Sequence, residues 1–214
     1  MPRVLIAVPT FENITPDTYQ ALWDMEKPCE CGFEFVRGYD CATARNNIAK
    51  LALAGGWTHV LMVDNDVTPP RDALVHLLGH GERVVSGFYM HRSSDTNAVT
   101  ERTCMCRKDK PNGGYYFGYP VESEYTAGEL REMRERGEHL VEVHGGGMGC
   151  ILIGTDVFDE LRYPWFDWVD YGHGIGMLSE DLFFCEQLHN ECIPMHVDTR
   201  VACGHLLRRI EYVN

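Results

Sequence analysis

The stretch His59-Val60-Leu61-Met62-Val63-Asp64-Asn65-Asp66 decides the fold of this chain. Its continuous apolar run is typical of a buried strand, and two carboxylates follow that run one residue apart. Because side chains alternate along a strand, Asp64 and Asp66 can point the same way at its carboxyl end, where open α/β sheets bind ligands. Carboxylate oxygens suit Mg²⁺ or Mn²⁺. The alternative interpretation is a polar turn before Pro69-Pro70, since aspartate and asparagine are common turn residues.

Strand and helix patterns alternate on both sides of this stretch. We expect strands over 3–9, 32–38, 58–63 and 83–89, and helices that begin at Thr15-Pro16, Ala42 and Pro69-Pro70. This order predicts one α/β domain over 1–214, with a mostly parallel central sheet and helices on both faces. The pattern breaks over 91–125, which we interpret as a flap or insertion beside the site. A capping box of Thr126 and Glu129 then predicts a short helix.

The composition narrows the class of protein. The chain is 44% hydrophobic and 24% charged, which is ordinary for a soluble globular domain. Its formal net charge of −13 opposes binding to a long nucleic acid, and a bound nucleotide should arrive with a metal that neutralises part of its charge. No apolar run approaches the roughly 20 residues that cross a bilayer, and the amino terminus does not resemble a secretory signal. We therefore expect a cytoplasmic protein without a transmembrane segment.

Nine cysteines are an odd number and are scattered through apolar patterns, which favours reduced thiols over a disulfide framework. Two Cys-x-Cys pairs, Cys29/Cys31 and Cys104/Cys106, raise the question of structural zinc. The one-residue spacing lacks the paired motif of common zinc sites, so the sequence leaves this question open.

Six short motifs follow one another along nearly the whole chain. They are Val8-Pro9-Thr10, Ala44-Arg45-Asn46, Val63-Asp64-Asn65-Asp66 with Pro69-Pro70, Gly147-Met148-Gly149-Cys150, Ser179-Glu180-Asp181-Leu182-Phe183-Phe184-Cys185 and Gly204-His205. In this order and spacing they resemble the GT-A-fold glycosyltransferases of the family 2-like group. The resemblance implies a GT-A fold and the transfer of a sugar from a nucleotide-sugar donor, most commonly a UDP-sugar, to a hydroxyl acceptor. It also implies a divalent metal, usually Mn²⁺.

The resemblance assigns donor-binding roles to four residues. Pro9 and Thr10, at the end of the first strand, match the backbone contact to the nucleotide. Asp40 could receive the base, or it could simply cap the helix that starts at Cys41. Arg45 could reach the ribose or the diphosphate, because guanidinium geometry suits phosphate oxygens; the alternative is a surface arginine.

The same resemblance predicts a metal site built from Asp64, Asp66 and His205. Asp64 matches the position that contacts ribose or metal-bound water, and Asp66 matches the direct metal ligand of the Asp-x-Asp motif. His205 matches the histidine that completes the coordination. A lone histidine would otherwise be interpreted as an ordinary core or surface residue.

The glycine run from Gly145 to Gly149 is expected near the donor sugar. The residues from Gly146 to Gly149, Gly147 included, could form the floor beneath that sugar, because glycine lets the backbone approach closely. The alternative is a plain turn between strands. A dinucleotide-binding loop is disfavoured, since the residues after the run continue as a strand where that fingerprint needs a helix.

Glu180 and Asp181 are the candidate catalytic residues. Both open a helix, so they could merely compensate its dipole. If the reaction inverts configuration, Asp181 is the expected general base and Glu180 the second choice; if it retains configuration, the leaving phosphate can take the proton. Five nearby aromatic residues could stack on an acceptor or pack in the core. They are Trp165, Phe166, Trp168, Tyr171 and His173.

Two other functions stay open. One is a catalytically silent nucleotide- or sugar-binding module of the same fold. The other is a nucleotidyltransferase that forms sugar nucleotides, although the glycine-rich, arginine-containing loop expected after its first strand is missing here. The sequence does not identify the acceptor.

Overall fold

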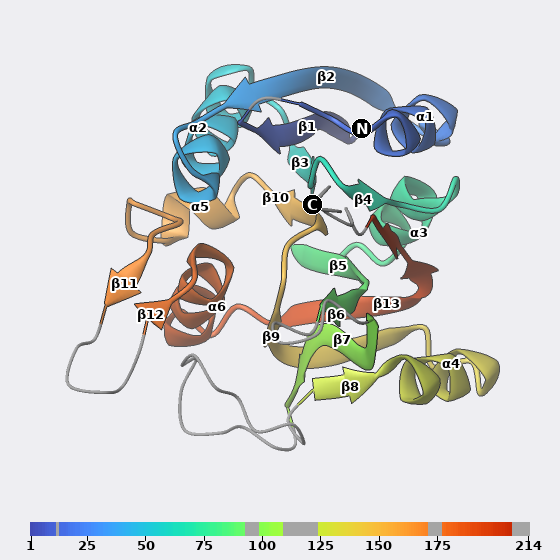
Figure 1. Ribbon diagram of the computed structural model, residues 1–214. Helices are drawn as coiled ribbons and strands as arrows, with labels where there is room; N and C mark the ends of the chain where they lie inside the picture. Colours follow the sequence, from blue (N-terminus) through green and yellow to red (C-terminus); the bar gives the residue numbers. More distant parts are fainter. Residues whose placement is uncertain (12, 93–98, 109–123, 171–176, 207–214) are drawn as a thin grey trace, which may run out of the picture.

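The computed structural model describes residues 1–11, 13–92, 99–108, 124–170 and 177–206 (Figure 1). The helices are α1 (Pro16–Asp24), α2 (Cys41–Ala54), α3 (Ala73–Gly79), α4 (Ala127–Glu135), α5 (Val157–Glu160) and α6 (Glu180–Asn190). The strands are β1 (Arg3–Thr10), β2 (Glu30–Arg37), β3 (His59–Val63), β4 (Val67–Thr68), β5 (Val84–Phe88), β6 (Met90–Arg92), β7 (Val99–Arg107), β8 (Glu124–Thr126), β9 (Leu140–Gly146), β10 (Cys150–Gly154), β11 (Val169–Asp170), β12 (Met177–Leu178), β13 (Met195–Ala202) and β14 (Gly204–His205).

A ten-stranded mixed sheet forms the centre, in the order β2-β1-β3-β10-β5-β13-β9-β7-β6, with β8 on β7. The prediction of a mostly parallel sheet is wrong. Within the described residues, only β1/β2, β1/β3 and β5/β13 pair in parallel, and the other six pairs of this sheet are antiparallel. Three of these antiparallel pairs involve β7, and two involve β10, an apolar strand that enters between β3 and β5 in the opposite direction. An apolar run looks the same whichever way it points.

Six strands of this sheet nevertheless point the same way, namely β1, β2, β3, β5, β7 and β13. The carboxyl ends of β3, β5 and β13 therefore lie at one edge of the sheet. They are followed directly by Asp64, Tyr89 and Cys203. This edge positions the candidate site.

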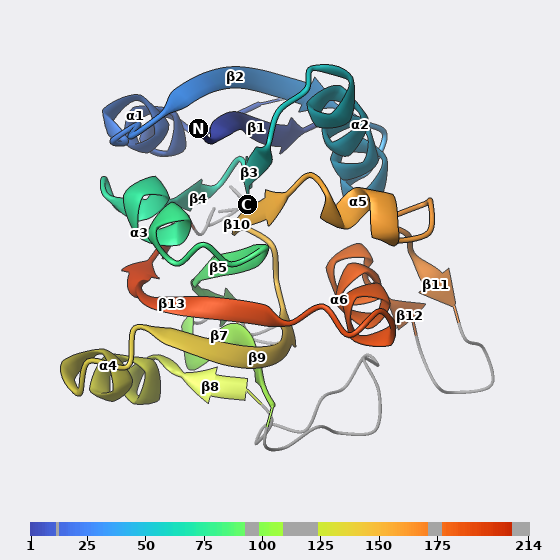
Figure 2. The ribbon, with the colours of Figure 1, turned by 180° about the vertical axis from the view of Figure 1, so that it is seen from behind.

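Helices cover both faces of the sheet, as expected. Leu5 and Ala7 of β1 pack in the same core cluster as Ile48 of α2, whereas Ile6 packs with Leu74 of α3 in a second cluster. This alternation is the two-residue period of a strand that is buried on both sides. Figures 1 and 2 show α2, α5 and α6 on one side of the molecule and α1, α3 and α4 on the other.

The stretch 91–125, predicted as a flap or insertion, contributes strands to the sheet where it is described. β7 pairs with β6, β8 and β9 at one end of the sheet. Residues 93–98 and 109–123 lie outside the described residues.

Local signals place several helix starts correctly. The Thr15 hydroxyl accepts a hydrogen bond from the Thr18 backbone N–H, and Pro16 occupies the first turn of α1. Thr126 and Glu129 form the predicted capping box of α4. Across the described part of the chain, no helix has the length and apolar character needed to cross a membrane.

Candidate functional site

A pocket of about 470 Å³ lies where β3, β5 and β13 end and α6 begins. Its size is typical of small-molecule sites. The lining residues are Asp64, Asp66, Tyr89, Cys104, Cys106, Glu124, Gly147, Ser179, Asp181, Leu182 and His205. The pocket thus gathers five of the residues predicted from the sequence, from segments far apart along the chain.

Asp66 and His205 meet at this pocket because β14 pairs with β4. The register places His205 opposite Val67, the residue after Asp66, and the Leu206 backbone N–H donates to the Asp66 carbonyl at 2.8 Å. His205 Nε2 then lies 3.7 Å from Asp66 Oδ2. The predicted convergence of these two side chains is confirmed.

The orientation of the His205 ring follows from its other nitrogen. Nδ1 lies 3.1 Å from the Met90 carbonyl oxygen. A carbonyl only accepts, so Nδ1 carries the hydrogen and, in the neutral ring, the lone pair is on Nε2, the nitrogen nearer Asp66. A backbone carbonyl on the far nitrogen is how metal-ligating histidines are commonly oriented.

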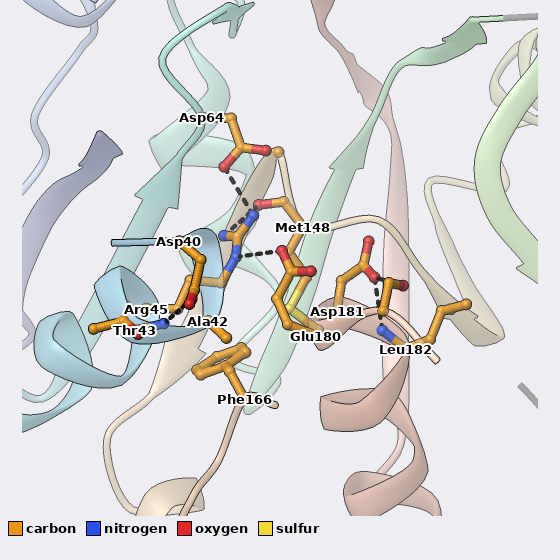
Figure 3. A network of polar contacts seen from close by, with 12 residues as sticks. Asp40, Ala42, Thr43, Arg45, Asp64, Met148, Phe166, Glu180, Asp181 and Leu182 are labelled. Atoms are coloured by element: carbon orange, nitrogen blue, oxygen red, sulfur yellow. Dashed lines mark hydrogen bonds and ion pairs between the residues drawn. The ribbon is translucent and has the colours of Figure 1, made fainter. Parts of the chain in front are cut away.

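Asp64 belongs to a buried ionic cluster behind the pocket (Figure 3). Arg45 of α2 is only 2% exposed, and its Nη2 donates to Asp64 Oδ1 at 2.8 Å. Its Nη1 donates to the Met148 carbonyl at 3.3 Å, and its Nε lies 3.6 Å from Glu180 Oε1. The interpretation of Arg45 as a surface residue is wrong. Its guanidinium faces protein groups, so a contact with ribose or diphosphate stays a prediction that this geometry does not favour.

The charges of the cluster act on one another. Burial by itself would lower the pKa of Arg45, but the charges around it, Asp64 foremost, outweigh burial and raise it. Burial raises the pKa of Asp64 and of Glu180, and the Arg45 charge offsets part of each shift. One guanidinium therefore faces more than one carboxylate, and Asp66 and Asp181 add further negative charge nearby. Such a site favours a cation.

The two candidate catalytic acids occupy different places. Asp181 lines the pocket, and its Oδ1 accepts hydrogen bonds from the Leu182 backbone N–H at 2.8 Å and from the Ser179 hydroxyl. Glu180 is 6% exposed and faces Arg45 instead (Figure 3). The geometry therefore favours Asp181 as the group that meets a substrate, and it gives Glu180 a structural role.

Close packing against Tyr89 and β7 explains why glycine occupies positions 146 and 147. A Cβ on Gly147 would lie 2.4 Å from Tyr89 Oη, and one on Gly146 would lie 2.7 Å from the Cys104 carbonyl oxygen. Both distances are far below van der Waals contact. Gly147 forms part of the pocket wall, whereas Gly146 ends β9 and is not among the lining residues.

Three predicted donor-binding residues lie away from the pocket lining. Pro9 is buried, and Thr10 Oγ1 donates to the Asn13 carbonyl at 3.0 Å. Asp40 accepts a hydrogen bond from the Thr43 backbone N–H at 2.7 Å, so it caps α2 as the alternative interpretation had it. Nucleotide contacts for these three residues stay predictions.

Tyr89 is a residue of the candidate site that the sequence interpretation missed. Its ring packs edge-on against His205, with centroids 5.0 Å apart, and it lines the pocket. The signal was available, because Tyr89 directly follows β5 just as Asp64 directly follows β3. Glu124, in the stretch without a clear pattern, carried no such signal.

The described residues bring together at most two side chains that could bind the same metal ion. Among the described residues, no three histidine, cysteine, aspartate or glutamate side chains are placed to share one ion. Asp64 is therefore not placed as a third ligand with Asp66 and His205. All nine cysteines are free thiols. Cys31 lies on β2 and Cys104/Cys106 lie on β7, far apart in the strand order, so the two Cys-x-Cys pairs do not meet around a shared zinc.

The aromatic cluster proposed for an acceptor divides between core and surface. Phe166 is buried and stacks on Phe184, and Trp165 packs against Phe158. Trp168 is exposed. Tyr171 and His173 lie outside the described residues.

Comparison with known proteins supports the fold alone. No protein-family model matches the chain, and no curated protein matches it by sequence. Among solved structures, the chain is similar to A197 from STIV, with a TM-score of 0.60 and 17% sequence identity. The similarity covers 96% of this chain and 86% of that one. At this level of identity, the two proteins share a mixed α/β architecture, and function does not transfer with it.

Proposed function

We propose that the chain is a glycosyltransferase of the GT-A type, which moves a sugar from a nucleotide-sugar donor to a hydroxyl acceptor with the help of Mn²⁺ or Mg²⁺. A UDP-sugar is the proposed donor. The observation that carries the proposal is the meeting of Asp66 and His205 within 3.7 Å, in the same pocket as Asp181. The pocket lies at the carboxyl ends of parallel-oriented strands, where α/β sheets bind nucleotides.

The residues present fit a divalent cation. Ligands about 2.1 Å from one ion can lie up to roughly 4.2 Å apart, so the separation of Asp66 Oδ2 and His205 Nε2 is compatible with a shared ion. Two protein ligands are enough for a cation that also binds phosphate oxygens of its substrate. When bound, it would neutralise charge that develops on the leaving nucleoside diphosphate.

Asp181 supplies the proton acceptor in this proposal. Its Oδ1 is held by Leu182 and Ser179, which fixes the side chain and leaves Oδ2 to receive the proton of an acceptor hydroxyl. A positioned base of this kind contributes about 10² to 10⁴ in rate. This role applies if the reaction inverts configuration. If it retains configuration, Asp181 would orient the acceptor instead.

Calorimetry with UDP, GDP and their sugars, with and without Mn²⁺, tests the proposal. Asp66→Ala should weaken Mn²⁺-dependent UDP binding by at least about tenfold, because even indirect partners of metal ligands contribute about 10- to 100-fold. The fold should survive, since Asp66 is 32% exposed. Asp159→Ala, an exposed carboxylate on α5, is the matched control and should bind like the wild type.

Two outcomes would contradict the proposal. Failure of every nucleotide to bind with Mn²⁺ would exclude it. Binding without donor hydrolysis or transfer to any acceptor would favour the catalytically silent module. Incubation with a sugar phosphate and a nucleoside triphosphate separately tests the nucleotidyltransferase alternative.

A further inference from the structure

The Tyr89 hydroxyl lies in the wall of the pocket. It accepts a hydrogen bond from the Gly149 backbone N–H at 3.3 Å and sits beside Gly147, which also lines the pocket. In the described part of the chain, no group accepts the hydrogen of this hydroxyl. Tyr89 is half-buried and lines the pocket, so this hydrogen is available to a group that enters the pocket.

The hydroxyl acts as a neutral donor. A phenol of ordinary pKa, about 10, is protonated near neutral pH. Tyr89 thus keeps its hydrogen at physiological pH. Its oxygen already accepts from the Gly149 N–H, and its hydrogen is left to donate to a ligand.

Two carboxylates in the same pocket offer the complementary interaction. Asp64 commits Oδ1 to Arg45, and Asp181 commits Oδ1 to Leu182 and Ser179. Within the described residues, the second oxygen of each makes no hydrogen bond, and Figure 3 shows that of Asp181 directed away from Leu182. The pocket therefore combines one neutral donor with two anionic acceptors.

This combination selects among ligand groups. A phosphate oxygen only accepts and carries negative charge, so Asp64 and Asp181 would repel it. An alcohol both donates and accepts, and it is neutral, so it can receive the Tyr89 hydrogen while giving its own to a carboxylate.

We propose that Tyr89 Oη, together with Asp64, binds a hydroxyl group of the sugar carried by the donor, which makes Tyr89 a specificity-determining residue. The inference rests on the proposed glycosyltransferase function and adds the group that the site recognises. The Tyr89 ring has a role separate from that of the hydroxyl, since it packs edge-on against His205. Removal of the hydroxyl alone should therefore leave the Asp66–His205 pair intact.

The test compares Tyr89→Phe with the wild type by calorimetry, using UDP and then UDP-glucose, UDP-galactose and UDP-N-acetylglucosamine, each with Mn²⁺. The best-bound UDP-sugar should bind roughly three- to tenfold more weakly to the variant, which is the usual effect of losing one neutral hydrogen bond. UDP itself should bind unchanged. Tyr163→Phe is the matched control, because its hydroxyl bonds to Lys50 outside this pocket; it should change neither affinity.

A second measurement uses the wild-type protein and does not depend on the variant's folding. Deoxygenated analogues of the best-bound UDP-sugar should include one that loses the same factor, and Tyr89→Phe should add no further loss with that analogue. Equal weakening of UDP and UDP-sugar would overturn the inference by placing the hydroxyl on the nucleotide, and no change with either would also overturn it. Absence of Mn²⁺-dependent UDP binding in the wild type would instead overturn the proposed function, and the inference with it.

Discussion

Asp64 and Asp66 are two residues apart, yet they belong to regions of different physical character. Asp66 is 32% exposed and faces His205 across 3.7 Å at the pocket. Asp64 also reaches the pocket, but one of its oxygens is held by the buried Arg45, which in turn lies beside Glu180. We call the first pair the pocket pair (Asp66, His205) and the second group the buried cluster (Arg45, Asp64, Glu180). The Asp-x-Asp motif thus joins one anchored carboxylate to one that faces the pocket beside His205.

The difference separates ligand binding from stability. A partly solvated pair such as the pocket pair contributes little to folding, typically 0 to about 1 kcal/mol, so its residues can be selected for binding. A buried ion pair behaves otherwise, because removing one partner leaves a charge without compensation. Changes in the pocket pair should therefore alter affinity, and changes in the buried cluster should alter the free energy of unfolding.

The largest effect is expected from Arg45→Met, which breaks the buried cluster while keeping a side chain of comparable length. Asp64 and Glu180 would lose their only buried cation in the described structure. We expect the free energy of unfolding, measured with urea at pH 8, to fall by about 3 to 5 kcal/mol. Arg71→Met is the control, since Arg71 is 74% exposed in its pair with Glu26 and its loss should cost no more than about 0.5 kcal/mol.

The deficit of Arg45→Met should also depend on pH. Burial already raises the pKa of Asp64 and Glu180 in the folded state. A carboxyl whose pKa is higher in the folded state destabilises that state progressively as pH rises from about 4, where the unfolded chain ionises, through the folded pKa. Loss of Arg45 raises both folded pKa values further. The deficit should therefore be smaller at pH 5 than at pH 8, and an equal deficit at both would show that packing, not charge, is what Arg45 supplies.

A smaller effect on stability is expected from Gly147→Ala, in the wall that both regions share. The new Cβ would lie 2.4 Å from Tyr89 Oη and 3.1 Å from the Cys104 Cβ. Overpacking of this kind costs about 1 to 3 kcal/mol, and displacement of Tyr89 should also weaken UDP-sugar binding. Gly79→Ala is the control, because no atom lies within 4 Å of its new Cβ; it should be neutral or stabilising by up to about 1 kcal/mol. Unfolding curves and calorimetry check both. If Gly147→Ala were as stable as the wild type, the residues around Gly147 would have room to move, and the predicted overpacking would be wrong.

Much of the fold could be predicted because local signals agreed with it. β1 and β3 are continuous apolar runs, α1 and α2 each begin with a side-chain cap, and Gly55 ends α2. The direction of β10 could not be predicted, since Cys150–Gly154 has no feature that differs between parallel and antiparallel pairing. The strand character of β7 was hidden as well, because Val99–Arg107 mixes polar and apolar residues without a clear period.

The sequence predicted which residues gather at the pocket, and it did not predict which candidate residues are buried behind the pocket. The rule that ligands bind at strand carboxyl ends, with the resemblance, brought Asp66, Asp181 and His205 together correctly. Burial of Arg45 and Glu180 depends on how α2 and α6 pack against each other, which no local pattern encodes. Both residues were therefore expected to face a ligand when they face one another.

Asp40 allows the smallest and sharpest test of which region a residue belongs to. Its carboxylate caps the helix that carries Arg45, and the sequence alone left a base contact equally open. Asp40→Ala should lower the free energy of unfolding by about 1 kcal/mol, whereas Asp40→Asn should stay close to the wild type because asparagine caps equally well. Neither change should alter UDP binding with Mn²⁺. If Asp40→Asn kept full stability but bound UDP more weakly, the carboxylate would have a ligand of its own, and Asp40 would belong with the pocket pair.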